Sequence, residues 1–267
     1  MRTFWKLTAI SMQSHLYYRT SFFINLLSPV ALLGGQYLLW AALYAQQEGG
    51  AIGGMERAEM FTYILLAFAM SNLLNWAGEN TLAREIKTGL VVARCVRPAF
   101  FLTQYMAQML GTLLTQGAVN LLLVFAGFAC FGKYMTVPSV SALAAFVPCL
   151  LLAVALRLLM IDVFSLLCFF TTGYLGIAWT RAALFDFFSG AMIPVVLFPG
   201  WLKTSACCTP FPYMLQVPVA VLLGQETVAG VGMPGIYGLQ IVWILVFLAL
   251  HVLLYGLARR NLTIAGG

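Results

Sequence analysis

Long runs of apolar residues are the feature of this sequence that most limits the folds open to it. Of its 267 residues, 62% are hydrophobic and 8% are charged, whereas about a quarter of the residues of a soluble domain are charged. Crossing the hydrocarbon core of a bilayer, about 30 Å thick, takes about 20 apolar residues of helix. Because the apolar runs are continuous rather than alternating, the sequence predicts an all-α membrane protein and not a β-barrel.

Six segments are long and apolar enough to be predicted as membrane spans. They leave no room for a soluble catalytic domain, so residues 1–267 are predicted to form a single transmembrane domain. The six predicted spans are residues 21–44, 60–77, 99–131, 142–168, 182–198 and 237–257.

The basic residues predict how these spans are oriented. With six spans, both termini lie on the same side of the membrane as segments 78–98 and 169–181, and ten of the fourteen basic residues fall on that side. By the positive-inside rule this side is cytoplasmic. Residues 1–20 mix aromatic and basic side chains, which predicts a helix lying in the cytoplasmic interface. Topology and anionic lipids account for the net charge of +6, so no nucleic-acid partner is expected.

Polar residues recur every four positions in the third predicted span. Each step of four residues turns a helix by about 40°, so these side chains form one slowly winding stripe. They either hydrogen-bond to neighbouring helices or line a polar pathway, and the sequence leaves both interpretations open. The stripe consists of Gln104, Gln108, Thr112, Gln116 and Asn120.

Four charged residues, Arg157, Asp162, Arg181 and Asp186, form a predicted intramembrane cluster on the fourth and fifth spans or at their ends. An unpaired charge at mid-membrane costs about 2.5–3.5 kcal/mol on insertion scales. We therefore expect Arg157 to pair with Asp162 or Asp186, in either a structural or a gating role, with Arg181 nearer the membrane surface.

The sequence predicts neither a catalytic site nor a metal site. Residues 127–134, GFACFGKY, begin like a phosphate-binding loop but end in Tyr134, where magnesium binding needs Ser or Thr. The two histidines, His15 and His251, stand near opposite ends of the chain, and no cysteine pair has the C-x-x-C spacing. The chain is therefore not expected to bind ATP or another cofactor itself.

The cytoplasmic stretch NTLAREIKTGLVVARCVRP, residues 80–98, predicts a short amphipathic helix between the second and third spans. Leu82, Ile86 and Leu90 share one face, and charged residues occupy the others. Such a helix either receives a partner protein or only anchors to lipid.

The segment before the last span is apolar but too interrupted to cross the membrane, because five of the ten prolines lie within residues 194–218. Residues 199–235 are accordingly predicted to form an extracytoplasmic re-entrant segment of short helices packed against protein.

Several short motifs, in this order, resemble the six-helix ABC-2 type permeases of bacterial ABC exporters. The resemblance covers nearly the whole chain, and Phe170 departs from it, since the family often has Trp there. The motifs are EIKTG at 85–89, RP at 97–98, FFTT at 169–172, SGAMIPVVLFPGWL at 189–202, PF at 210–211 and LLG at 222–224.

The resemblance implies a non-enzymatic permease in the bacterial cytoplasmic membrane. It implies a dimer with a second permease chain, identical or related, and two separate ATPase subunits that hold ATP and magnesium. Residues implied to couple to the ATPase are Leu82, Arg84, Glu85, Ile86 and Lys87; those implied for the translocation path are Phe68, Asn72 and Asn75; those implied for an outer gate are Pro199, Pro210, Phe211 and Pro218.

Two other functions stay open on the residues alone. A stand-alone secondary transporter would need buried proton-relay carboxylates, for which Asp162 and Asp186 are candidates. An intramembrane enzyme would need a nucleophile and a base, and the sequence shows no such pair. A wide apolar path favours a hydrophobic or amphipathic transported compound, whose identity the sequence does not specify.

Overall fold

The computed structural model describes residues 2–17, 19–46, 51–74, 81–89, 101–131, 135–171, 173–225, 227–228 and 231–261. The protein is mostly helical, as predicted. Its α-helices are α1 (Arg2–Tyr17), α2 (Arg19–Ala45), α3 (Arg57–Leu74), α4 (Thr81–Lys87), α6 (Phe101–Phe131), α7 (Val140–Leu166), α8 (Tyr174–Phe188), α9 (Gly200–Cys207), α10 (Gln216–Leu222) and α11 (Met233–Asn261).

Short elements connect some of these helices. The 3-10 turn η2 (Leu167–Phe169) extends α7, and η3 (Val195–Leu197) precedes α9. Strands β1 (Ala51–Ile52) and β2 (Met55–Glu56) form an antiparallel hairpin before α3, with Ile52 opposite Met55. Strands β3 (Thr227–Val228) and β4 (Val231–Gly232) form a second antiparallel hairpin before α11.

Three helices of the described residues are long and apolar enough to cross a membrane: Met106–Ala129, Val140–Phe169 and Met233–Ala258. They correspond to the third, fourth and sixth predicted spans. Helices α2 and α3 coincide closely with the first and second predicted spans. That all six segments cross the membrane stays a prediction.

The bounds predicted for the fifth span, residues 182–198, are wrong. Helix α8 begins eight residues earlier, at Tyr174, and ends at Phe188. The chain then turns at Gly190, whose φ of +86° lies in the region that favours glycine. Part of the predicted cytoplasmic loop 169–181 is therefore helix, and Arg181, expected near the membrane surface, is only 3% exposed.

The core lies where α3, α7 and α10 meet. Helix α7 packs against α10 and α11, while α3 packs against α2, α6 and α10. Every residue of α10 is buried, although this helix is too short to span a bilayer. Its burial is compatible with the predicted re-entrant segment, because backbone at membrane depth is tolerated where protein surrounds it.

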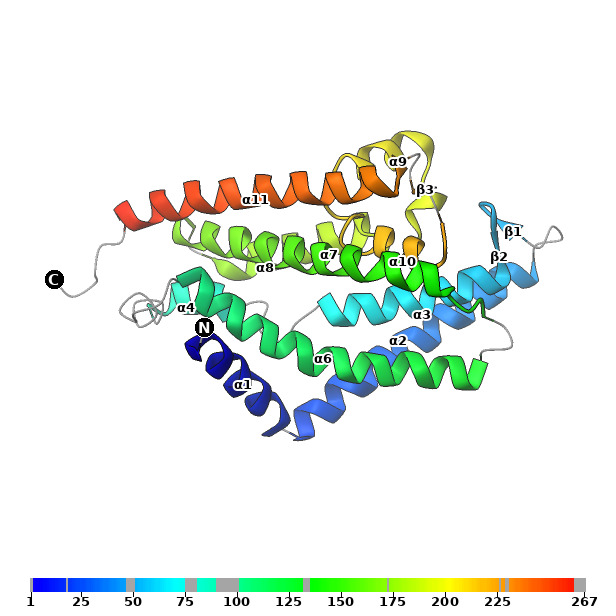
Figure 1. Cartoon of the computed structure of the whole chain (residues 1–267), viewed down its shortest axis with the longest axis horizontal. Coiled ribbons are helices and arrows are strands. Elements are labelled where there is room, and N and C mark those ends of the chain that lie inside the picture. Colours follow the sequence, from blue (N-terminus) through cyan, green and yellow to red (C-terminus); the bar gives the residue numbers. More distant parts are fainter. Residues whose placement is uncertain are drawn as a thin grey trace.

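Helix α1 is separate from the bundle of long helices and lies against α6 (Figure 1). The Thr8 hydroxyl donates to the Ala107 carbonyl at 3.1 Å, and the Ser11 hydroxyl donates to the Gln108 carbonyl at 2.8 Å. Gly111 permits this approach, because a Cβ there would lie 2.5 Å from the Thr8 carbonyl oxygen. The predicted interfacial helix is thus fixed to α6 through small residues, as is common between membrane helices.

Figure 1 places the two predicted sides of the membrane at opposite ends of the molecule. Helix α4, the start of α1 and the end of α11 lie at one end. The two hairpins, α9 and α10 lie toward the other. The long helices α6, α7 and α11 extend between these ends.

Candidate functional site

Helix α4 forms within the predicted cytoplasmic stretch and has a defined C-terminus. The Thr88 amide donates to the Arg84 carbonyl at 2.9 Å, and the Gly89 amide donates to the Ile86 carbonyl at 3.3 Å. Gly89 has φ +75°, the left-handed conformation that commonly ends a helix. The predicted helix is thus present over residues 81–87, and residues 90–98 of the stretch lie outside the described residues.

One face of α4 is held by the protein itself. Ala83 is buried and Ile86 is 9% exposed, and the helix contacts η2, α7 and α8. The Lys87 ammonium donates to the Thr171 carbonyl in the turn between α7 and α8. Because these contacts fix it to η2, α7 and α8, α4 can pass a displacement to the α7–α8 turn.

The other face of α4 is open. Arg84 and Lys87 are exposed and Glu85 is half-buried. The Arg84 side chain makes no hydrogen bond with the part of the chain that the structure describes, while its carbonyl accepts from Thr88. The side chain of Leu82 lies outside the described part. Arg84 therefore lies on the exposed face, whereas Ala83 and Ile86 face the bundle.

Arg157, in the predicted charge cluster, is fully buried and joins three helices. Its guanidinium carbon lies 3.8 Å from the centre of the Phe185 ring of α8, and its Nε donates to the Leu74 carbonyl at the end of α3 at 3.4 Å. A cation over an aromatic face is stabilised by the ring's negative charge density, more so when desolvated. Its pairing with Asp186, which is half-buried on α8, stays a prediction.

Asp162 contacts a residue that was not predicted as its partner. Its carboxylate, 0% exposed, contacts Nδ1 of the buried His251 of α11. The His251 ring lies parallel to that of Tyr255, one helical turn away, with centroids 5.8 Å apart. This pair joins α7 to α11.

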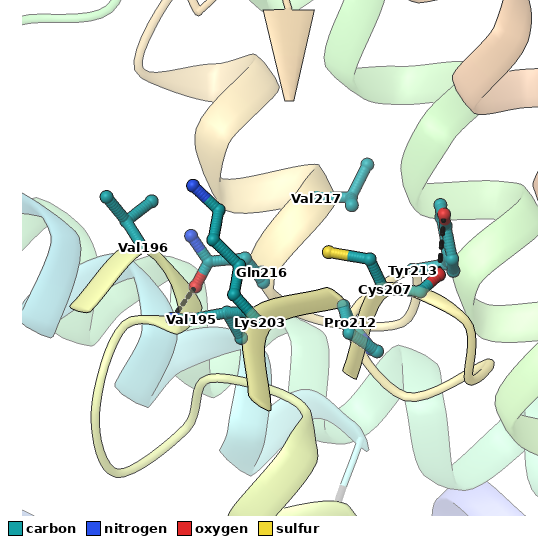
Figure 2. Close-up of a pocket in the computed structure, with 8 residues that line it drawn as sticks. All are labelled: Val195, Val196, Lys203, Cys207, Pro212, Tyr213, Gln216 and Val217. Carbon is teal, nitrogen blue, oxygen red and sulfur yellow. Dashed lines mark hydrogen bonds between the residues drawn. The ribbon is translucent and has the colours of Figure 1, made fainter. Parts of the chain in front are cut away.

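The motif SGAMIP, residues 189–194, forms a turn around two side chains that are distant in the sequence. The Tyr63 hydroxyl of α3 donates to the Gly190 carbonyl at 2.7 Å and also contacts Gln216 Oε1. The Val195 amide donates to the same Oε1 at 3.3 Å, as Figure 2 shows. One buried amide oxygen of α10 thus contacts α3 and the first residue of η3, while the Gly190 carbonyl joins the turn after α8 to α3.

Gly190 is the residue of this turn least able to change. In Gly190→Ala, the new Cβ would lie 2.4 Å from Gln216 Oε1 and 2.8 Å from the Tyr63 hydroxyl, at a φ of +86°. Strain of this kind costs about 1–3 kcal/mol, so we expect a clearly lower midpoint of thermal unfolding in detergent. Gly176→Ala is the matched control, because nothing lies within 4 Å of its Cβ. Equal midpoints in the two variants would contradict the assigned packing.

The predicted outer-gate residues gather around α9 and α10 but differ in burial. Pro199 precedes α9 and is exposed, while Pro210 and Pro218 are buried. Phe211 is buried and its ring is stacked with that of Phe188, with centroids 6.1 Å apart. Of the predicted gate residues, Phe211 is thus packed against the end of α8.

Two of the predicted path residues share one side of α3. Phe68 and Asn72 are half-buried, one turn apart, on a helix whose residues 60–67 are all buried. Asn75 lies outside the described residues. The open side of α3 is therefore the side that carries the predicted path.

The polar stripe of α6 is described in part. Gln104 and Asn120 are buried and Gln108 is half-buried, whereas the side chains of Thr112 and Gln116 lie outside the described part. Both interpretations of the stripe stay predictions.

Sequence reasoning missed several residues that connect helices: Tyr63, Gln216, His251 and Gln240. The Gln240 amide nitrogen donates to the Tyr213 carbonyl at 2.9 Å and to the Cys149 carbonyl at 3.2 Å. A polar or ionisable side chain within an apolar run is costly without a partner. His251 and Gln240 are polar residues of this kind within an apolar run, so a partner could have been expected for each. The sequence does not indicate which residues those partners are.

Most of the chain is similar to one protein family. The sequence model of the family described as ABC-2 family transporter protein matches residues 30–266. No curated protein and no solved structure matches the chain. The similarity includes α4, the outer turn and every helix from α3 to α11.

Proposed function

We propose that this chain works as an exporter coupled to ATPase subunits through α4. The premise is that it belongs to the family of ABC-2 transporter proteins and is a multi-pass membrane permease of an ABC transporter. The observation that carries this proposal is the division of α4. Ala83 and Ile86 face its own bundle, while Arg84 and Lys87 are exposed. A partner that binds the exposed face moves the bundle with it.

In this mechanism the partner ATPase binds ATP and magnesium, and this chain supplies the helices that move. Closure of two ATPase subunits displaces α4, and the contact between Lys87 and Thr171 carries the displacement to the turn between α7 and α8. Arg84, Glu85 and Lys87 contact the ATPase. Ile86 anchors α4 to the permease, since its side chain is buried.

The displacement reaches the outer side through α8. Its C-terminal end is joined to α3 and α10 at the turn that contains Gly190. Phe68, Asn72 and Asn75 of the path face a second permease chain across the dimer interface, whether that chain is identical or related. We assign Pro199, Pro210, Phe211 and Pro218 to the outer gate.

The transported compound is hydrophobic or amphipathic, because apolar helices surround the path. The transporter lies in the bacterial cytoplasmic membrane with both termini in the cytoplasm. The large excess of basic residues on the predicted cytoplasmic side supports this orientation.

Co-purification and transport test this function together. An affinity-tagged chain, expressed with the ATPase encoded nearest to it, is expected to retain that ATPase on the resin and in size-exclusion chromatography. Proteoliposomes with both proteins are expected to move the amphipathic dye rhodamine 6G only with ATP and magnesium. Dye movement by the chain alone, driven by a proton gradient, would contradict the proposal and favour a secondary transporter using Asp162.

A further inference from the structure

A groove lies between α9 and the first turns of α11. It has a volume of about 530 Å³, and its lining includes Lys203 and Thr204 of α9 together with Leu239, Val242 and Trp243 of α11. It adjoins a narrower cavity of about 20 Å³, which also involves Lys203 and is drawn in Figure 2. The narrow cavity has room for about one water molecule, so the groove is the part able to receive a larger ligand.

The groove is positively charged at one end. Lys203 is its only charged residue, and no acidic residue of the described chain lines it. No carboxylate in the described ranges lies within 4.0 Å of the Lys203 ammonium. An anionic group is the complement of such a site.

The other end of the groove is apolar and opens onto the outer surface of α11. Val242 is 53% exposed, and the neighbouring Leu245 and Val246 continue an exposed apolar surface along the helix. On α9, Trp201 is 73% exposed, two residues before Lys203. Tryptophan and lysine beside an apolar surface are typical of the boundary between lipid chains and headgroups.

We propose that this groove binds one anionic membrane phospholipid, with its phosphate at Lys203 and an acyl chain along Val242 and Trp243. A small soluble anion would satisfy Lys203 but leave the apolar wall uncovered. A zwitterionic lipid would cover the wall but gain less from the unpaired ammonium. The site is independent of the direction of transport and of the ATPase, so it does not rest on the proposed function.

Native mass spectrometry of the full chain in detergent tests the site with two probes, phosphatidylglycerol and phosphatidylcholine with identical acyl chains. One Lys or Arg near a lipid surface contributes about fivefold in affinity. Lys203→Gln is expected to lower the affinity for phosphatidylglycerol about fivefold without changing that for phosphatidylcholine. Lys203→Arg, which keeps the charge, is expected to retain the preference.

Arg57→Gln is the matched control. It removes the same charge from an exposed residue outside the groove, whose guanidinium lies 5.4 Å from the centre of the Phe61 ring. An equal loss of phosphatidylglycerol affinity in Lys203→Gln and Arg57→Gln would refute the site. Glycerol phosphate, the headgroup without acyl chains, is expected not to displace the lipid at millimolar concentration. Displacement there would assign the site to free phosphates and refute the acyl-chain contact.

Discussion

Exchanging two neighbouring charges on α4, with Arg84→Glu and Glu85→Arg together, is expected to abolish substrate-stimulated ATP hydrolysis while leaving the permease folded in the membrane. Arg84 is exposed and Glu85 is half-buried, so neither charge lies in the fully buried core of the bundle. Disrupting one partner of a buried charge pair at an interface costs about 2–5 kcal/mol, a loss of about 30-fold or more in affinity. Retention of the ATPase on the tagged permease should fall accordingly.

The junction of β2 and α3 offers a matched control for this exchange. Glu56 and Arg57 are also an adjacent, exposed acid and base, and exchanging them likewise preserves the net charge. Glu56→Arg with Arg57→Glu is expected to leave hydrolysis and ATPase retention unchanged. The measurements are phosphate release by the purified complex and the stoichiometry of permease to ATPase in size-exclusion chromatography. Unchanged stimulation in the α4 variant would remove α4 from the coupling path.

Hydropathy was sufficient to place most of the long helices. Helices α2, α3, α6, α7 and α11 lie within a few residues of their predicted spans, because each apolar run is bounded by charged, polar or loop residues. The fifth run continues with apolar residues beyond Ser189 and Gly190, so hydropathy alone did not show that the helix ends at Phe188. The chain turns there because Gly190 is held by Tyr63 and Gln216, contacts between residues far apart in the sequence that hydropathy does not encode.

The amphipathic pattern of residues 80–90 predicted a helix at the right place but not the surface that it faces. The resemblance to ABC-2 type permeases implied that Ile86 couples to the ATPase. The structure shows it packed into its own bundle. Periodicity identifies an apolar face, but the partner of that face depends on the packing of η2, α7 and α8 around it.

The charges inside the spans show a similar limit. The cost of an unpaired buried charge predicted a partner for Arg157, either Asp162 or Asp186, and that pairing stays a prediction. The structure shows a contact that was not predicted, between Asp162 and His251, 89 positions away in sequence. Depth estimates locate a residue along the membrane normal, whereas the choice of partner depends on which helices are neighbours, and α7 packs against α11.

Breaking the pair of Asp162 and His251 is expected to be the most destabilising change considered for this bundle. His251→Leu leaves a buried carboxylate without its partner, because Asp162 Oδ1 has no hydrogen bond in the described part of the chain. Removing one member of a buried pair costs about 3–5 kcal/mol. Replacing both by Leu removes the charge and its partner together, which is often neutral or stabilising.

The double variant therefore shows whether Asp162 and His251 stabilise the fold as a pair or as two independent buried residues. The free energy of unfolding of the full chain in micelles, measured by circular dichroism during SDS titration, should fall by more in His251→Leu than in Asp162→Leu with His251→Leu. Ser165→Ala is the control on the same helix, because its hydroxyl, among the described residues, bonds within α7 to the Ile161 carbonyl at 2.7 Å, and its loss should cost about 1 kcal/mol. If the losses of unfolding free energy caused by the two Leu substitutions add in the double variant, each residue contributes independently and the contact does not join α7 to α11. A smaller loss in the double variant would instead identify this contact as the interaction that holds α11 against α7.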